Sequence, residues 1–425
     1  MTNRPKVRKA FLQEQTMKPQ RRPVSRRQVL GGGFALATMA APFVRANAAV
    51  PIRIGFPVPL TGPYEQEALD MLRGAHTAVA MFNEQGGLNG RPAELLMRDD
   101  ELNPVRAAEV TRALIANDHV DFVTGGLSAS VQLAINKVTK AARVVFNSIS
   151  QSDAIVAMPD WSPYTFHEAL TPHTTSQVVG QYVFSRYNKR VAFLAADYAF
   201  GAEMVRGFEA AGRPFNIDVV ATVRHPVGMT DFSPLLDQIV AAKPDILVFC
   251  NFGDDQEFSV QQASWLGLKK SMLFVAPLLV FDARLDAGSE AYEGVLGGAS
   301  YYWRLEDSVP TAAAFNRKFR ALTEGRVPSD YGALGFAGVM TVLTAARAAG
   351  SIASAKLIEA MRGMTFDLYK GPEHYRTCDH QAVQSVLIIS NRSTDKANDM
   401  DVFNIVEIQP PSEQHLESCA ALGHK

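Results

Sequence analysis

PLTGPYEQEALDMLRGAHTAVAMFNEQGGLNGRPAELLMRDD, at residues 59–100, is the stretch that decides the fold of this chain. Just before it, apolar residues alternate with period two over residues 52–58, which is typical of a strand. Within it, apolar residues recur at three- and four-residue steps from about Glu67 and predict a helix with one buried stripe. Gly86-Gly87 and Asn89-Gly90 end this helix, because these residues tolerate the positive φ that a chain reversal needs. The stretch therefore predicts a β-α-β unit, whose first loop lies where open α/β sheets bind ligands.

The rest of the chain continues the alternation of strands and helices. Strands are predicted at 93–99, 120–124, 143–147, 191–196, 217–223, 245–250 and 272–276. Helices lie between them, for example at 104–117, which Asn103-Pro104 opens as N-cap and first-turn proline. This alternation predicts an α/β fold with parallel central sheets and helices on both faces. A chain of 425 residues needs two such doubly wound lobes.

The first 48 residues have the features of an export signal. Ser25-Arg26-Arg27-Gln28-Val29-Leu30 is a twin-arginine motif, and a modestly apolar stretch follows it as far as Val44. That stretch is shorter than the roughly 20 residues that span a bilayer as a helix. Ala46-Asn47-Ala48 supplies a small-residue cleavage site, and Arg45 favours the twin-arginine route. We therefore expect a periplasmic protein whose residues 1–48 are removed; Met17 is an alternative start.

Charge excludes one class of partner. The first 48 residues hold ten of the 42 basic residues and one of the 43 acidic residues, so the exported chain carries a net charge of −10. An acidic chain is a poor binder of nucleic acid. We expect a small-molecule ligand, no nucleic acid and a monomer.

Several short segments, in order along the chain, resemble one family. The opening TGP, the later GA and FNEQGGLNGR are followed by YTFHEAL (164–170), DYAFG (197–201), TDFS (230–233), YGALGFAG (331–338) and GPEHYR with DHQ (371–381). This series resembles the periplasmic solute-binding proteins of the branched-chain amino acid family, which have the type I binding-protein fold. The resemblance implies two lobes joined by a three-strand hinge, with a ligand captured between them when they close.

The resemblance also implies where the chain crosses between lobes. It places the crossings near Leu170-Thr171, Gly298-Ser300 and Arg376. The expected domains are lobe 1 at 49–170 and 299–376, and lobe 2 at 171–298 and 377–425 including a C-terminal tail.

Two loops of lobe 1 are candidate ligand sites. Gly125-Gly126-Leu127-Ser128-Ala129-Ser130 follows a strand and opens a helix, where free backbone N–H groups and a hydroxyl can hold a carboxylate. Simple N-capping by Ser128 is the alternative. The loop 147–151 follows the next strand and offers polar groups at the same edge. The resemblance implies that these loops grip a ligand carboxylate, through Ser128, Ala129, Ser130, Ile149 and Gln151.

Lobe 2 is expected to supply aromatic walls. Tyr198 and Phe200 lie in the DYAFG turn, and Phe252 follows the strand that ends at Cys250. The resemblance implies that aromatic residues at or near these positions cover the ligand. Ordinary packing in the core is the alternative for each of them.

Leu278 is the main departure from the family. Amino-acid-binding members usually carry an acidic residue after the proline that corresponds to Pro277, and this acid pairs with the ligand's ammonium group. A buried ammonium without a partner would cost several kcal/mol. Either another carboxylate replaces it, with Glu67, Asp254 and Asp255 as candidates, or the ligand has no α-amino group. Solvated or capping roles are the alternatives for these three acids.

The cysteines indicate a disulfide rather than a metal site. Cys250 lies in an apolar strand and is expected to be a buried thiol. Cys378 and Cys419 flank the C-terminal segment, and export permits a disulfide between them; two free thiols are the alternative. No C-x-x-C or nearby histidine pair has metal-ligand spacing. We expect no metal and no cofactor.

Catalytic motifs are missing from the sequence. It has no G-x-S-x-G elbow, no GxxxxGK loop, no H-E-x-x-H and no GxGxxG after a strand. Asp99-Asp100-Glu101 is interpreted as a strand end and turn cap, and His380 as structural. We therefore predict a non-enzymatic binding component of an ABC importer, with permease and ATPase subunits as partners, that takes an apolar amino acid or a related carboxylate or amide. The alternatives are a ligand-sensing receptor subunit and an exported hydrolase.

Overall fold

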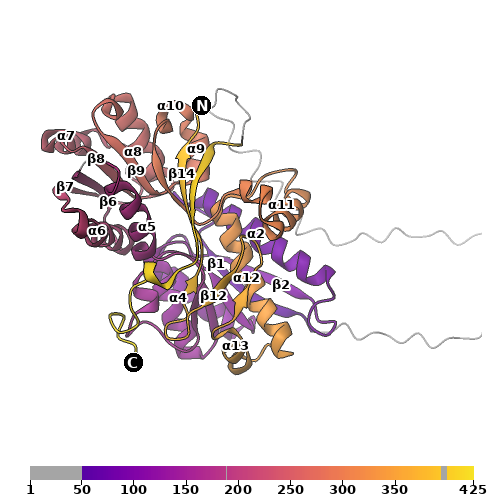
Figure 1. Ribbon diagram of the computed structural model, residues 1–425. Coiled ribbons are helices and arrows are strands. Elements are labelled where there is room, and N and C mark those ends of the chain that lie inside the picture. The colour runs from indigo at the N-terminus through magenta and orange to yellow at the C-terminus, as the bar shows by residue number, and fades with distance from the viewer. Residues whose placement is uncertain (1–49, 188, 394–399) are drawn as a thin grey trace, which may run out of the picture. The chain divides into compact units, whose positions relative to one another are not determined.

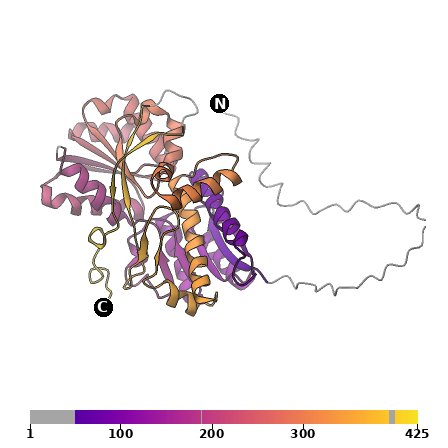
Figure 2. The same ribbon diagram turned by 45° about the vertical axis from the view of Figure 1, so that its right-hand side comes forward.

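The computed structural model describes residues 50–187, 189–393 and 400–425 (Figure 1). The predicted signal peptide lies outside the described residues. The described chain forms two α/β lobes, each around its own sheet, and this confirms the predicted fold class. Figures 1 and 2 show that early and late segments share a lobe: the indigo start lies with the orange helices, and the yellow strands lie with the magenta and salmon segments.

Lobe 1 contains a five-stranded sheet in which every neighbouring pair is parallel. Its strands lie in the order β2-β1-β3-β4-β5. They are β1 (Ile52–Val58), β2 (Ala93–Asp99), β3 (Phe122–Gly125), β4 (Val145–Ser148) and β5 (Thr165–His167). Because they are parallel, their carboxyl ends share one edge, and the loops that follow β3 and β4 open at that edge.

Lobe 1 takes its helices from two parts of the chain. They are α2 (Glu65–Glu84), α3 (Pro104–Ala116), α4 (Ala129–Ala142), α11 (Pro310–Leu322), α12 (Asp330–Ala349) and α13 (Ser354–Met361). The helices α2 and α12 approach each other very closely. A Cβ atom added at Gly74 would lie 1.8 Å from the Gly332 carbonyl oxygen, and one at Gly335 would lie 2.0 Å from that of Met71. The glycines of YGALGFAG therefore allow the contact of two helix backbones.

Helix α12 is long and apolar enough to cross a membrane by length and composition alone, and 78% of its most apolar window is buried inside the protein. It is the only helix of the described residues that meets this criterion. Its apolar side chains pack in the core of lobe 1. The helix is thus a core element, and Asp330 and Tyr331 form its first turn.

Lobe 2 contains a seven-stranded sheet in the order β15-β14-β10-β9-β8-β6-β7. Its strands are β6 (Arg190–Ala196), β7 (Asp218–His225), β8 (Ile246–Cys250), β9 (Leu273–Leu278), β10 (Leu296–Ala299), β14 (Val386–Asn391) and β15 (Phe403–Gln409). Its helices are α5 (Pro172–Phe184), α6 (Ala199–Gly212), α7 (Ser233–Ala242), α8 (Asp254–Trp265), α9 (Phe281–Ala287) and α10 (Ser289–Tyr292). The pairs β10–β14 and β14–β15 are antiparallel. The prediction of parallel sheets is therefore wrong for these two strands, which enter from lobe 1 as a hairpin.

A small third sheet and short 3₁₀ helices complete the described structure. The sheet consists of β11 (Thr365–Phe366), β12 (Glu373–Tyr375) and β13 (Ala382–Val383), and His167 of lobe 1 bridges to Gln381 beside it. The 3₁₀ helices lie at Ala154–Val156, Arg213–Phe215, Leu268–Lys270, Trp303–Asp307 and Glu413–His415.

The chain passes between the lobes three times. The first passage lies between β5 and α5, and the second follows β10 at Ser300. The third passage to the lobe 2 sheet follows β13, at Gln384-Ser385, and the expected crossing near Arg376 stays a prediction. The Arg376 guanidinium pairs with Asp379 at 2.5 Å, and the Arg376 N–H donates to the Gln381 carbonyl in the hairpin between β12 and β13.

Two buried side chains join the three passages. Lys370 Nζ donates to the Ser300 carbonyl at 3.0 Å and to the side-chain oxygen of Gln384. The amide nitrogen of Gln384 in turn donates to the Glu168 carbonyl. Glu373 Oε2 lies 3.9 Å from Lys370 Nζ, and burial raises the pKa of this carboxyl well above its usual value. The passages are thus held to one another by hydrogen bonds, and not only by the chain.

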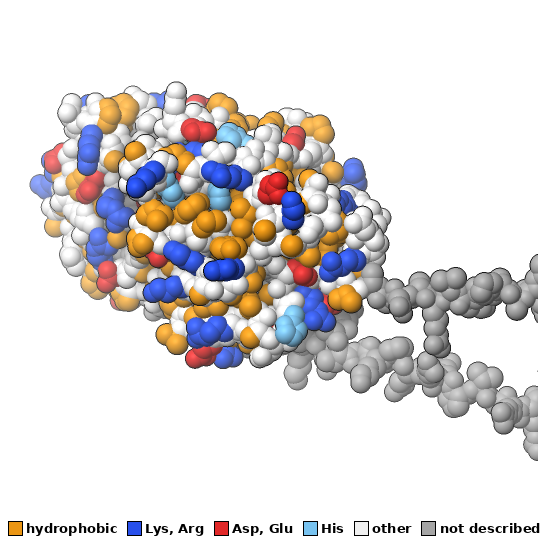
Figure 3. Space-filling model, turned by 90° about the horizontal axis from the view of Figure 1, so that it is seen from below, with side chains coloured by type: hydrophobic (Ala, Val, Ile, Leu, Met, Phe, Trp, Pro, Cys, Tyr) orange, Lys and Arg blue, Asp and Glu red, His pale blue; other side chains and the backbone are white. Residues whose placement is uncertain are grey.

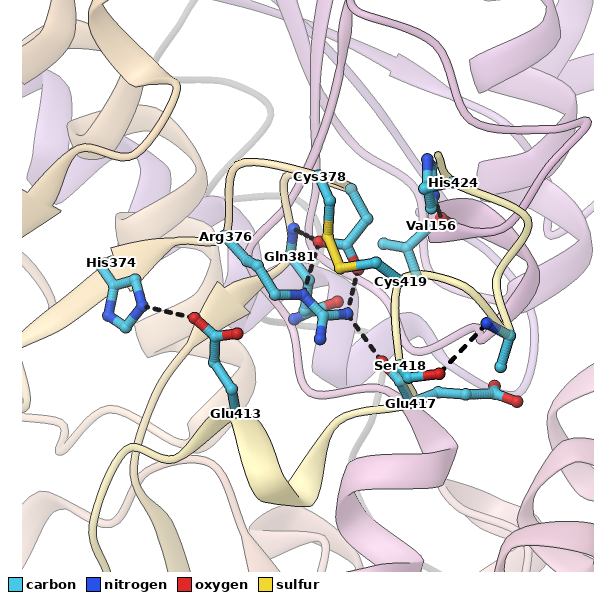
Figure 4. The surroundings of a disulfide bond; sticks show 12 residues. Val156, His374, Arg376, Cys378, Gln381, Glu413, Glu417, Ser418, Cys419 and His424 are labelled. Atoms are coloured by element: carbon cyan, nitrogen blue, oxygen red, sulfur yellow. Dashed lines mark hydrogen bonds and ion pairs between the residues drawn. A yellow bond between two sulfur atoms is a disulfide. The ribbon is translucent and has the colours of Figure 1, made fainter.

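The C-terminal tail returns from lobe 2 to lobe 1. Cys419 forms a disulfide with Cys378, the predicted pair, and Figure 4 shows its surroundings. The Arg376 guanidinium also donates to the Glu417 carbonyl at 3.0 Å. Beyond the disulfide, the Met158 N–H donates to the Leu422 carbonyl at 2.9 Å. Leu422 and His424 therefore contact lobe 1, whereas the 3₁₀ helix Glu413–His415 contacts α5 of lobe 2.

One face of the molecule carries more basic than acidic side chains (Figure 3). Figure 3 shows Lys and Arg side chains spread around exposed hydrophobic ones, with few acidic side chains on this face. The charges of the described residues are therefore distributed unevenly over the surface (Figure 3).

Candidate functional site in the cavity between the lobes

A small cavity of about 20 Å³ lies between the two lobes. This volume holds about one water molecule, so a ligand needs the lobes to separate before it can enter. Its walls come from the loops after β3 and β4, two of the three passages, the start of α12 and the lobe 2 loops. They are formed by Leu127, Ser128, Ala129, Ile149, Ser150, Gln151, Leu170, Tyr198, Phe200, Phe252, Leu278, Ser300, Asp330, Tyr331 and Leu334.

Most residues predicted from the sequence lie together in this wall. The eight are Ser128, Ala129, Ile149, Gln151, Tyr198, Phe200, Phe252 and Leu278. Ser130 does not line the cavity, because it lies one residue further into α4, where its side chain is half-buried. Glu67 is buried in the first turn of α2 and is not in the wall. The structure brings the eight together, and their contact with a ligand stays a prediction.

The loop after β3 depends on two glycines. Gly125 and Gly126 have φ values of +125° and +76°, and a Cβ atom at Gly125 would lie 2.4 Å from the Pro57 carbonyl oxygen. The Gly126 N–H donates to that same oxygen at 2.7 Å. The loop is thus held against β1, and Ser128 caps α4 by accepting from the Val131 N–H at 3.2 Å. Ser128 can cap the helix and still donate its hydroxyl proton to an anion in the cavity.

The loop after β4 is fixed by a buried histidine. His167 Nε2 lies 2.8 Å from the Ser150 carbonyl oxygen, and His167 Nδ1 lies 2.5 Å from Gln381 Oε1. Burial lowers the pKa of His167. Ser150 and Gln151 thereby take fixed positions in the wall.

Aromatic rings from both lobes meet beside the cavity. The Phe252 ring stacks on Tyr64 of lobe 1 with centroids 4.2 Å apart, and lies 6.1 Å from Tyr331. Tyr198 and Phe200 lie 6.0 Å apart in lobe 2. Sequence reasoning missed Tyr64 and Tyr331, although both stand inside segments that carry the family resemblance.

The start of α12 brings a carboxyl group into the cavity. Asp330 is only 5% exposed, and its Oδ1 atom has no hydrogen-bond partner among the described residues. Burial, and then the nearby Asp282 carboxylate, raise the pKa of Asp330 to about 8. Sequence reasoning missed this acid; its position directly before YGALGFAG was the available signal. The hydroxyl of Ser300 is a second buried wall group without a partner in the described structure.

The acids proposed from the sequence lie elsewhere. Burial, and then Asp282, raise the pKa of Glu67 well above its usual value. Asp255 is buried, accepts from the Gly228 N–H at 2.8 Å, and has its pKa raised by burial to about 7. Neither residue lines the cavity, and neither does Asp254.

Two other predicted structural roles are visible in the contacts. Asp99 Oδ1 accepts from the Leu60 N–H at 3.0 Å and from the Glu101 N–H at 2.9 Å, so this acid closes a turn and holds the first loop. His380 stacks on Phe166 with centroids 4.2 Å apart. Within the described residues, no group of three or more His, Cys, Asp or Glu side chains could hold a metal ion.

Comparison with known proteins decides the family. Residues 51–396 match the family model for periplasmic binding proteins. The chain belongs to this family. The family resemblance found in the sequence is thereby confirmed, and the family is one of solute-binding proteins.

Relatives of this binding protein differ in the ligands that their names carry. A leucine-, isoleucine-, valine-, threonine- and alanine-binding protein of Pseudomonas aeruginosa is 25% identical over 343 residues, which are 80% of this chain and 87% of the relative. A periplasmic binding protein of Burkholderia mallei is 26% identical with a TM-score of 0.80, and the match covers 87% of this chain and 97% of that one. A solute-binding protein of Rhodopseudomonas palustris, solved with 3,4-dihydroxybenzoic acid, is 22% identical with a TM-score of 0.76, covering 85% and 98%.

Proposed function

We propose that this chain is the exported substrate-binding component of an ABC importer. In this role it captures a small organic solute, an apolar amino acid or a related carboxylate or amide, by closure of its two lobes. The observation that carries the proposal is a cavity whose walls come from both lobes, with hydroxyl groups on one side and aromatic rings on the other. A ligand that contacts both walls favours the closed state over the open one.

The carboxylate pole of the ligand is proposed to lie at the loops after β3 and β4. There, Ser128 and Ala129 at the start of α4 line the cavity together with Gln151. The first turn of a helix leaves N–H groups without intrahelical partners, and its dipole favours an anion. Ser130, one residue further into α4, remains a candidate through its backbone N–H.

The apolar part of the ligand is proposed to lie against lobe 2. Tyr198, Phe200, Phe252 and Leu278 form that wall, and all are buried or nearly so. Both amino acids and aromatic carboxylates have an apolar body that suits it, and both occur in the names of relatives. The group that distinguishes the two classes is the ammonium group.

We also propose the route and partners that this function needs. The twin-arginine motif at residues 25–30 supports export to the periplasm through that route, with cleavage after Ala48. In the periplasm the protein would act as a monomer and deliver its ligand to permease and ATPase subunits at the inner membrane. A fusion of residues 1–48 to a reporter should be exported, and Arg26→Lys with Arg27→Lys should block it.

A ligand panel tests the proposed function. The exported chain should be stabilised by at least one apolar amino acid, aromatic carboxylate or amide, seen as a raised melting temperature. A ligand at a hundred times its dissociation constant adds about 2.7 kcal/mol to the free energy of unfolding. Product assays on esters and amides should show no turnover. A panel in which nothing raises the melting temperature, or one in which a stabilising compound is hydrolysed, contradicts the proposal.

A further inference from the structure

The polar groups of the cavity wall are distributed unevenly between the lobes. The lobe 2 wall ends at Leu278, an apolar side chain that is 4% exposed. Asp330, from lobe 1, is the only ionisable carboxyl among the described residues that line the cavity, and no Lys or Arg is among them. The wall therefore contains a potential negative charge and no positive one. A cationic group is the ligand feature that such a wall can pair with.

Asp330 is held rigidly. Ser329 caps α12 by accepting from the Gly332 N–H at 3.2 Å, and its own N–H donates to Asp70 Oδ2 at 2.9 Å. Asp70 belongs to α2, which packs backbone to backbone on α12. The contact between the two helices thus fixes the position of the Asp330 carboxyl group before a ligand binds. Such preorganisation lowers the cost of binding.

The Oδ1 atom of Asp330 is buried and without a partner in the described structure. Leaving a buried polar atom unpaired costs free energy, and natural proteins rarely do so without a reason. Ser300 Oγ and the Tyr198 hydroxyl are in the same condition and also line the cavity. Three such atoms in one wall point to a ligand that completes their hydrogen bonds.

We propose that Asp330 binds the ammonium group of the ligand, and that the ligand is therefore an amino acid or another amine and not a simple carboxylate. The inference rests on the proposed function and assigns the substrate class of its site. It moves the ammonium subsite to lobe 1, across the cavity from Leu278. The carboxylate of the same ligand then lies toward Ser128, and its side chain against the lobe 2 aromatic rings.

The surroundings of Asp330 give the binding reaction a proton signature. Carboxyl groups face it from α2 (Asp70 and Glu67) and from α9 (Asp282), and Lys370 and the Tyr331 hydroxyl are the other titratable groups near it. With its pKa raised to about 8, Asp330 is mostly protonated in the empty cavity at pH 7. Pairing with an ammonium group requires the carboxylate, so binding releases a proton to the buffer. Affinity should then increase with pH up to about 8.

Matched ligand pairs test this assignment by titration calorimetry on the exported chain. L-Leucine is compared with 4-methylpentanoate, and L-phenylalanine with 3-phenylpropanoate, because each pair differs only in the ammonium group. In any pair that binds, we expect the amino acid to bind at least about 100-fold more tightly than its partner. At pH 7, the heat of amino-acid binding should change with the ionisation enthalpy of the buffer, which reports the released proton.

Variants separate Asp330 from its neighbours. Asp330→Asn should lower amino-acid affinity about 100-fold and abolish the buffer dependence, while it leaves the affinity for the deaminated partner unchanged. Asp100→Asn is the matched control, because it neutralises another buried acid of lobe 1 that neither lines the cavity nor shifts the pKa of Asp330, and affinity should stay within about threefold. The melting temperature of each empty variant shows that it is folded.

The outcomes distinguish the two proposals. If the deaminated compounds bind as tightly as the amino acids, or if Glu67→Gln lowers affinity and Asp330→Asn does not, the assignment to Asp330 is overturned while the binding function stands. If no member of either pair binds and the wider panel stabilises nothing, both proposals fail together.

Discussion

At the residue scale, the site is decided by two side chains that face one cavity from opposite lobes. The family resemblance predicts an acid at the position of Leu278, and Asp330 presents a buried carboxyl from lobe 1. The sequence pointed to Leu278 as a departure but not to its replacement. An acid 52 positions later could be connected with it only through the packing of α12 on α2.

The raised pKa of Asp330 makes the stability of the empty protein depend on pH. An unfolded aspartate has a pKa near 3.9, whereas folding raises that of Asp330 to about 8. Between these values the folded state binds a proton that the unfolded state has lost, so this contribution to stability declines as pH rises toward 8. From pH 6 to 8, the free energy of unfolding should fall by up to about 1.4 kcal/mol per pH unit more in the wild type than in Asp330→Asn.

Denaturant titrations at several pH values measure this difference. Comparison with the variant cancels buried groups that do not interact with Asp330, including His167 and His380, whose pKa values burial lowers. Above about pH 8 the two proteins should change in parallel. Equal slopes from pH 6 to 8 would contradict the assigned pKa.

At the scale of elements, the sequence pattern predicted where strands lie but not which elements contact one another. Predicted strands such as 93–99 and 245–250 agree with β2 and β8 to within a residue, because alternation and turn residues are local signals. The loops after β3 and β4 were predictable for the same reason, since each follows a strand. The positions of Tyr331 and Ser300 in the cavity wall were not predictable, because only tertiary packing places the start of α12 and the second passage beside the cavity.

The contact of α2 with α12 makes a clear test of packing. Gly335→Ala adds a methyl group where a Cβ atom would lie 2.0 Å from the Met71 carbonyl oxygen. Alanine favours a helix over glycine by about 1 kcal/mol, so helix propensity alone predicts stabilisation. We expect instead a loss of about 1–3 kcal/mol, because the two backbones must separate.

Chemical denaturation shows whether Gly335→Ala raises or lowers the free energy of unfolding. Ala348→Gly on the exposed side of the same helix is the matched control, and it should cost about 1 kcal/mol through propensity alone. A Gly335→Ala variant that is more stable than the wild type would show that the helices can move apart freely.

At the scale of the whole molecule, the C-terminal tail is stabilised by a covalent link. The Cys378–Cys419 disulfide closes a segment with a sequence separation of 41 residues that includes both lobe 2 hairpin strands. Replacing Cys378 and Cys419 together by serine should lower the free energy of unfolding by about 3–4 kcal/mol in the chain-entropy model. Cys250→Ser is not an equivalent control, since this thiol is buried in β8; the reduced wild type is the better one. A double variant as stable as the oxidised wild type would contradict this role.

The hydrogen bonds of Lys370 and Gln384 have a mechanical consequence. Three separate strands between two bodies would allow bending, twisting and sliding as independent motions. With the passages at Glu168, Ser300 and Gln384 bonded to one another, a displacement of one is transmitted to the other two. We therefore expect these buried hydrogen bonds to resist sliding of one passage past another when the lobes move.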